Sequence, residues 1–214
     1  MSRVAAISQP SLFPPLDWWN RRQKADVVVS LDDANYDPSF PANRCTLWKG
    51  GPRPLTAPIY GEQHRLPINK IDLAHGWEKD LVPQLDSYYP SRPRDLPLYR
   101  GAPSLLWLVY ASIAYCKGQL GIADQDVSSS LLKVKSAGNQ RLIDLCHAVE
   151  ADTLLLSRDR ENDVAAEQPL FASAGITVWY HDWECPVENL SVLHYLLTDG
   201  AQKTKEHITS AATT

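Results

Sequence analysis

The fold of this 214-residue chain is decided by residues 8–44, SQPSLFPPLDWWNRRQKADVVVSLDDANYDPSFPANR. A short apolar run, Val4–Ile7, precedes this stretch, and a second run, Asp26–Leu31, lies within it. The second run is rich in β-branched residues, which is typical of a buried parallel strand. Asp17 can cap a helix over Trp18–Lys24. Strand, helix and strand in this short space predict a βαβ unit with a right-handed crossover.

The segment that follows is rich in proline and differs in character. Short runs at Cys45–Trp48, Leu55–Tyr60 and Leu66–Leu73 predict short strands, and Gly50–Gly51 predicts a hairpin turn. We therefore expect a short antiparallel β insertion around residues 44–73.

The remainder of the chain alternates between helical and strand patterns. Strands are expected over residues 127–132, 152–157 and 176–180, and helices over residues 77–89, 105–115, 141–150, 163–174 and 190–197. Ser104 is expected to cap the helix that runs through Tyr115. The predicted fold is α/β, with a mostly parallel sheet flanked by helices in three layers. Residues 1–200 are predicted to form a single domain, and residues 201–214 a polar, frayed C-terminal tail.

Composition excludes several classes of protein. The net charge of −4 argues against nucleic acid as the main partner, because binding phosphate backbones requires a concentrated positive surface. The longest apolar run, Leu105–Cys116, is too short to cross a membrane, and the apolar run near the N-terminus is too short for a secretory signal. These features predict a soluble cytoplasmic protein without a membrane partner.

Neither a metal nor a cofactor is predicted from the sequence. The four cysteines form no CxxC pair and no zinc-ligand spacing, so they are expected to be free thiols. Cys45 and Cys185 lie near polar loops, where a reactive role is an alternative to a buried one. The phosphate-binding, zinc-protease and nucleophile-elbow motifs are absent. The six histidines show no pairing pattern, and His181, which follows a predicted strand, is the best candidate among them.

Polar side chains follow the first two predicted strands, and ligands of open α/β sheets bind beyond such strand ends. Ser8 and Gln9 follow the first strand, and the alternative for them is a turn that caps the next helix. Asp32 and Asp33 end the second strand. One of these carboxylates can act as a general base or bind an amine or sugar hydroxyls. The alternatives are a helix cap or an ion pair with Arg44.

Two further groups of polar residues are candidates for binding a substrate. The first lies in the Pro-rich loop, where Asn35, Tyr36 and Asn43 accompany Arg44, and a guanidinium can bind a carboxylate or phosphate. The second brackets the entry to a later helix, a position that favours anions; it comprises Ser128–Ser130, Lys133, Lys135 and Arg141. The alternatives are a structural arginine and an ordinary solvated turn.

Several motifs, taken in their order and spacing, resemble the WbqC-like family of bacterial proteins. The resemblance covers nearly the whole chain, through Ile7–Pro14, Ala25–Asp26, Leu31–Tyr36, Asn43–Arg44, Leu55–Ile59, Leu120–Ile122, Ser128–Ser130, Arg141–Cys146, Ala151–Thr153, Gly175–Ile176 and Leu190–Leu193. Family members of this kind belong to gene sets for O-antigen or other surface sugars and for natural products.

The resemblance implies a biosynthetic transferase that moves an acyl or aminoacyl group to an amine on a sugar or small metabolite. Asp32 and Ser8 are the expected catalytic residues. The expected partners are a small-molecule or nucleotide-sugar substrate and an acyl carrier or aminoacyl donor. The residues expected to bind these molecules are Gln9, Asp33, Asn35, Tyr36, Asn43, Arg44, Ser129, Lys133 and Arg141.

The chain departs from the family pattern at several positions. Ser8 stands where the family usually has histidine, Asn35 replaces glutamine, and residues 158–161 replace a glycine-rich loop. An unassisted hydroxyl is a poor base. The alternative function is therefore that of a non-catalytic accessory or carrier-binding protein with a degenerate active site.

Overall fold

The computed structural model describes residues 2–39, 41–123, 125–158, 164 and 167–210. Contacts divide the chain into two compact units, each built from three segments. Unit 1 comprises Met1–Gln9, Trp18–Asp32 and Gln125–Glu184, and unit 2 comprises Pro10–Asp17, Asp33–Asp124 and Cys185–Thr214. The segments of the two units alternate along the chain. The single α/β domain expected over residues 1–200 stays a prediction.

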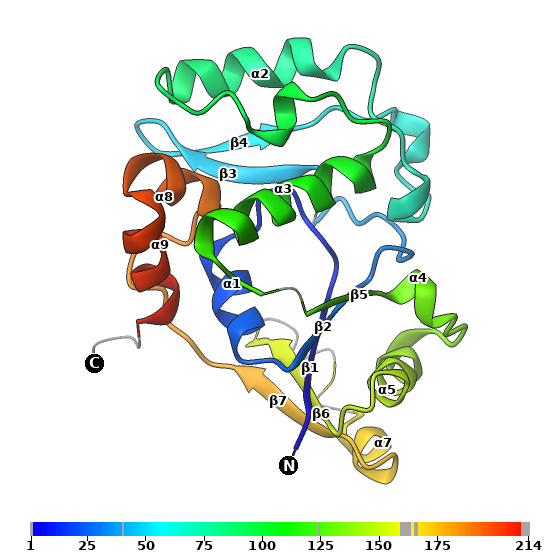
Figure 1. Ribbon diagram of the computed structural model, residues 1–214. Coiled ribbons are helices and arrows are strands. Elements are labelled where there is room, and N and C mark those ends of the chain that lie inside the picture. Colours follow the sequence, from blue (N-terminus) through cyan, green and yellow to red (C-terminus); the bar gives the residue numbers. More distant parts are fainter. Residues whose placement is uncertain (1, 40, 124, 159–163, 165–166, 211–214) are drawn as a thin grey trace. The chain divides into compact units, whose positions relative to one another are not determined.

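Unit 1 contains a five-stranded sheet in the order β5-β2-β1-β6-β7, and every strand pairing in it is parallel (Figure 1). The strands are β1 (Val4–Ser8), β2 (Val27–Ser30), β5 (Asp126–Ser128), β6 (Thr153–Ser157) and β7 (Thr177–His181). Three of them, β1, β2 and β6, are buried over nearly their whole length. This accounts for their continuous apolar runs and confirms the predicted α/β class.

The connections of the sheet place helices on both of its faces. Helix α1 (Leu16–Gln23) joins β1 to β2, whereas α5 (Gly138–Ala148) joins β5 to β6 and α7 (Gln168–Ser173) precedes β7. In the sheet, β2 lies on one side of β1, whereas β6 and β7 lie on its other side. The connection from β1 to β2 therefore runs in one direction across the sheet, and the connections from β5 to β6 and from β6 to β7 run in the opposite direction. Right-handed crossovers therefore put α1 on one face, and α5 and α7 on the other. The core beneath α5 and α7 includes Ile7, Val29, Leu154, Ile143 and Phe171.

Unit 2 contains the predicted antiparallel hairpin, β3 (Arg44–Trp48) and β4 (Pro52–Thr56). Gly50 and Gly51 make the turn with φ angles of +62° and +143°, which glycine adopts without strain. The prediction of a third strand over residues 66–73 is wrong. That segment forms a 3-10 turn, η2 (Ile68–Lys70), because Ile68 and Ile71 are both buried and Pro67 offers no N–H to a strand ladder.

Helices make up much of the remainder of unit 2. They are α2 (Trp77–Tyr88), α3 (Leu105–Leu120), α8 (Val192–Thr198) and α9 (Gly200–Thr209), together with the short 3-10 turns η1 (Gly61–Gln63) and η3 (Pro97–Tyr99). The predicted cap of α3 is confirmed, since Ser104 Oγ accepts a hydrogen bond from the Trp107 main-chain nitrogen at 3.3 Å.

Two further predicted elements differ from the structure. The expected frayed tail forms α9 instead, because Thr204 and Ile208 are fully buried, while residues 211–214 lie outside the described part of the chain. The strand expected over residues 127–132 ends at Ser128 and continues as a single helical turn, α4 (Ser129–Leu132). The cause of that second change is the side chain of Asp32, described below.

Candidate functional site

The last residues of the parallel strands form one row across the sheet. The strand register pairs Ser8 with Ser30, Ser30 with Ser128, and Ser157 with His181. Continuing the β1–β6 register by two residues places Ser157 opposite Ser8. Because side chains alternate between the two faces of a sheet, these five side chains project from the same face. We call these five residues the carboxyl-edge row.

The carboxyl-edge row crosses the point at which the strand order reverses. β1 pairs with β2, which follows it directly in the chain, and on its other side with β6, which comes much later. Open α/β sheets bind ligands beyond the carboxyl ends of the strands at such a switch point. Ser8 and Ser157 are the residues of the row that flank it.

Helix α1 holds two members of the row in fixed orientations. The Trp18 indole nitrogen donates to Ser8 Oγ at 3.1 Å. The His181 ring nitrogen Nε2 lies 2.7 Å from Asn20 Oδ1, and only 7% of His181 is exposed. With the amide oxygen as acceptor, Nε2 is the donor of this hydrogen bond. The row therefore contains a hydroxyl that accepts a hydrogen bond from Trp18 and an imidazole that is held through Nε2 by Asn20.

Asp32, predicted to be catalytic, fixes the turn into α4. Its carboxylate accepts hydrogen bonds from Ser129 Oγ at 3.1 Å, from the Ser130 main-chain nitrogen at 2.9 Å and from Ser130 Oγ at 2.6 Å. Only 3% of Asp32 is exposed. This geometry corresponds to the helix-cap alternative, because a carboxylate at the start of a helix satisfies main-chain donors there. A catalytic role for Asp32 stays a prediction.

Three more predicted residues lie in unit 1. Gln9 is half-buried and directly follows β1. Lys133 is exposed and ends α4 in a left-handed conformation, with φ at +57°. Arg141 is half-buried on α5. The binding of an anion by these two cations and the Ser128–Ser130 run stays a prediction.

The predicted residues of the Pro-rich loop lie in unit 2, so the predicted site is divided between the units. Asp33 is half-buried there and Asn35 is exposed. The Tyr36 hydroxyl donates to Asn43 Oδ1 at 2.8 Å, and Asn43 Nδ2 donates to the Ala57 carbonyl at 2.6 Å. Asn43 is fully enclosed by these partners and fastens the loop to the hairpin.

Arg44 does not form the ion pair considered as its structural alternative. Its Nε donates to Thr56 Oγ1 at 3.2 Å across the hairpin, the side chain is exposed, and no described carboxylate pairs with it. Burial raises the pKa of the neighbouring Tyr36 phenol, and the Arg44 guanidinium opposes part of that rise. Tyr36 also stacks on His64, with ring centroids 5.4 Å apart. Arg44 is thus an exposed cation beside an aromatic pair in unit 2.

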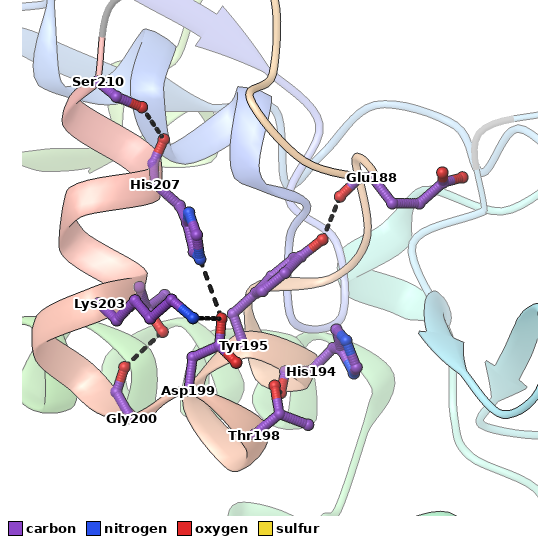
Figure 2. Close-up of polar contacts among 10 residues, drawn as sticks. Glu188, His194, Tyr195, Thr198, Asp199, Gly200, Lys203, His207 and Ser210 are labelled. Carbon is purple, nitrogen blue, oxygen red and sulfur yellow. Dashed lines mark hydrogen bonds and ion pairs between the residues drawn. The ribbon is translucent and has the colours of Figure 1, made fainter.

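Figure 2 shows a second polar cluster in unit 2, formed by α8 and α9. His207 Nε2 and Lys203 Nζ lie 2.9 Å and 3.6 Å from Asp199 Oδ2. The Tyr195 ring packs between His194 and His207, with centroid distances of 4.8 Å and 5.3 Å. Burial lowers the pKa of His194. The cluster fastens α9 against α8, and the sequence did not reveal it because the paired residues are eight positions apart.

Ser8, Ser128 and His181 of the carboxyl-edge row were candidates from the sequence, whereas Ser30 and Ser157 were not predicted. A signal was present, because the runs VAAIS, VVVS, DVS and TLLLS all end in serine. These serines can be recognised as one row only once the strands are aligned side by side. Asn20, which orients His181, carried no signal because its position on α1 is that of an ordinary polar helix residue.

Three of the four cysteines are buried, and Cys185 is partly accessible. Cys45, Cys116 and Cys146 are buried, and burial raises the pKa of the Cys45 thiol to about 12. The reactive alternative for Cys45 is therefore wrong, since a thiolate is the nucleophilic form. Cys185 is half-buried, and burial raises its pKa as well. Within the described residues, no group of three or more His, Cys, Asp or Glu side chains could hold a metal ion.

The fold and the row define the class of this protein: a doubly wound α/β protein whose parallel sheet carries polar side chains at its switch point. The chain belongs to the WbqC-like protein family, whose model matches residues 9–206. No curated protein and no solved structure is significantly similar to the chain. None of the helices in the described ranges is both long and apolar enough to cross a membrane.

Proposed function

We propose that this chain is a biosynthetic transferase that moves an acyl or aminoacyl group to an amine of a sugar or small metabolite. The amine binds at the carboxyl-edge row. The observation that supports the proposal is the alignment of four hydroxyls and one imidazole across the switch point of a parallel sheet. Hydroxyls bind sugar hydroxyls and amines, and a neutral imidazole accepts a proton near neutral pH.

His181 is the proton acceptor in this proposal. The amine nitrogen attacks the acyl carbonyl carbon and forms the new C–N bond. His181 Nδ1 takes the proton that the nitrogen loses, while the carrier group leaves with the electron pair of the bond that breaks. Asn20 keeps Nε2 as the donor during this step. Ser8 accepts from Trp18, so its own proton is directed toward another acceptor, such as the carbonyl oxygen of the substrate.

Charge supports the placement of an anionic group near α4 and α5. Lys133 and Arg141 lie in the segment that follows the row at Ser128. A guanidinium binds a phosphate through two parallel hydrogen bonds, and an ammonium binds it as a point charge. The phosphates of a nucleotide sugar or of a carrier are the proposed ligands of these two side chains. Asp32 acts here as a positioning residue that holds Ser129 and Ser130.

The test uses UDP-glucosamine as the amine and acetyl-pantetheine as the donor, with the amide product quantified by mass spectrometry. His181→Gln is expected to lower kcat by roughly 10²-fold or more, with a small effect on KM, which is the usual loss on removing a general base. His147→Gln is the matched control, because His147 is exposed on α5. Wild-type turnover in the double variant Ser8→Ala, His181→Gln would show that the row is not the site.

The second candidate is a non-catalytic accessory or carrier-binding protein. Ser8 favours it, because Ser8 stands where the family usually has histidine and an unassisted hydroxyl is a poor base. Its experiment is titration of the protein with a phosphopantetheinylated acyl carrier protein. A tight complex, without turnover of any amine in the panel, would favour this function over the transferase.

A further inference from the structure

A cavity of about 350 Å³ opens in unit 2 between α3 and the Pro-rich segment before it, where η3 lies against the helix. This volume falls in the range of small-molecule sites. One wall is the α3 face that carries Trp107, Ala111, Ala114 and Tyr115. The other wall comes from the segment Asp95–Arg100. No residue of this cavity belongs to the carboxyl-edge row or to the predicted site.

The α3 wall has the form of an aromatic slot. Residues 107, 111, 114 and 115 share one helix face by their spacing. The two alanines leave an open floor between the indole of Trp107 and the phenol of Tyr115. Trp107 is 41% exposed although α3 is otherwise a largely apolar, buried helix. An exposed tryptophan beside small residues is suited to stacking against a flat or bulky apolar body.

The opposite wall supplies one charge of each sign. Asp95 and Arg100 stand at the two ends of η3. Throughout the described part of the chain, neither the Asp95 carboxylate nor the Arg100 guanidinium has a hydrogen bond or an ion pair. Asp95 lies near Tyr115: burial raises the pKa of the Tyr115 phenol to about 12, and the Asp95 carboxylate adds to the rise.

This wall is anchored to unit 2 rather than mobile. Arg92 has a side chain that is 1% exposed, pairs with Asp86 and donates to the Tyr99 hydroxyl. Its Nη1 also donates to the Tyr89 carbonyl at 3.2 Å. Leu96 and Leu98, on either side of Pro97, are fully buried. The cavity is therefore preformed, which lowers the entropic cost of binding a small ligand.

We infer that this cavity binds a small zwitterion with an aromatic or bulky apolar body, the chemical class of free aromatic α-amino acids. Asp95 receives the ammonium, Arg100 receives the carboxylate, and the body lies between Trp107 and Tyr115. The aromatic slot alone would accept any apolar molecule, whereas two opposite charges on one wall select a molecule that carries both. The inference does not rest on the proposed transferase function.

The experiment is calorimetric titration of the full chain with L-phenylalanine, phenethylamine and 3-phenylpropionate. L-Phenylalanine is expected to bind at least roughly tenfold more tightly than either of the other two, because each of them lacks one charged hydrogen bond. Asp95→Asn should weaken phenylalanine and phenethylamine by a similar factor and leave phenylpropionate unchanged. Arg100→Gln should weaken phenylalanine and phenylpropionate and leave phenethylamine unchanged.

Three further variants keep the test decisive. Ala111→Leu fills the slot without removing a polar group and is expected to abolish binding. Asp80→Asn and Arg53→Gln remove an exposed acid and an exposed base elsewhere in unit 2, and both should bind phenylalanine like the wild type. Circular dichroism and melting temperature establish that each variant is folded. The inference is overturned if phenylalanine at millimolar concentration gives no heat of binding, or if wild type and Ala111→Leu bind phenylalanine equally.

Discussion

Replacing Asp32 with alanine removes the acceptor of three hydrogen bonds at the start of α4. Ser129 is fully buried, so its hydroxyl is left without that partner, whereas the half-buried Ser130 recovers part of its bonding to water. One hydrogen bond to a charged group contributes about 1.5–3 kcal/mol. Because Ser130 is partly solvated, we expect a total loss of about 3 kcal/mol in the free energy of unfolding, near the upper end for one such bond.

The assay combines urea denaturation with amide hydrogen exchange. A loss of about 3 kcal/mol corresponds to a fall in melting temperature of roughly 6–12 °C for a chain of this size. Exchange at the Ser130 amide should accelerate, because that N–H donates to Asp32 Oδ1 at 2.9 Å. Ser130→Ala completes a double-mutant cycle that isolates the hydroxyl–carboxylate contact. Asp182→Ala is the control for loss of an acid in unit 1, since Asp182 is exposed and its change should stay within about 0.5 kcal/mol.

A loss below about 0.5 kcal/mol, together with unchanged exchange at the Ser130 amide, would refute the structural role of Asp32. A variant of wild-type stability that has lost turnover would instead return Asp32 to the catalytic role predicted from the sequence. A destabilised variant that keeps its turnover under folding conditions would confirm the positioning role alone. The stability and activity of this one variant therefore separate the two functions.

Three other outcomes are expected. Asp86→Ala removes the carboxylate that pairs with the buried Arg92, and we expect a loss of about 3 kcal/mol in urea denaturation, the low end for a buried cation, because Asp86 is itself 39% exposed. Burial raises the pKa of Asp199, but the hydrogen bond from His207 and other nearby groups outweigh it, so the net pKa is lowered. The stabilisation that the Asp199 carboxylate contributes to the folded protein is therefore present above the ordinary carboxyl pKa and is lost as the pH falls through the lowered pKa. Wild type and Asp199→Asn should therefore converge in stability in acid, as measured by urea denaturation. Under mildly alkaline conditions a thiol reagent should modify Cys185 in the native protein and the three buried cysteines only after unfolding, as counted by intact mass.

Local patterns were sufficient to predict most of the elements and the fold class. The β-branched run of β2, the apolar run of β6 and the amphipathic face of α5 are each visible within a short window. The cap at Ser104 and the hairpin turn at Gly50 and Gly51 likewise depend on the residues at those positions and their immediate neighbours. The order and spacing of motifs were also sufficient to indicate the WbqC-like family, which the family model confirms.

The composition of the candidate site depended on long-range packing. Asp32 meets Ser130 across 98 positions of the chain, and His181 meets Asn20 across 161. No local pattern encodes such pairings, because strand register is fixed by the sum of many weak packing contacts across the sheet. The same reason explains α9, whose polar sequence becomes helical once Thr204 and Ile208 are buried. The chain thus specifies locally which strands end in polar side chains, and packing over long sequence distances selects which of those side chains meet.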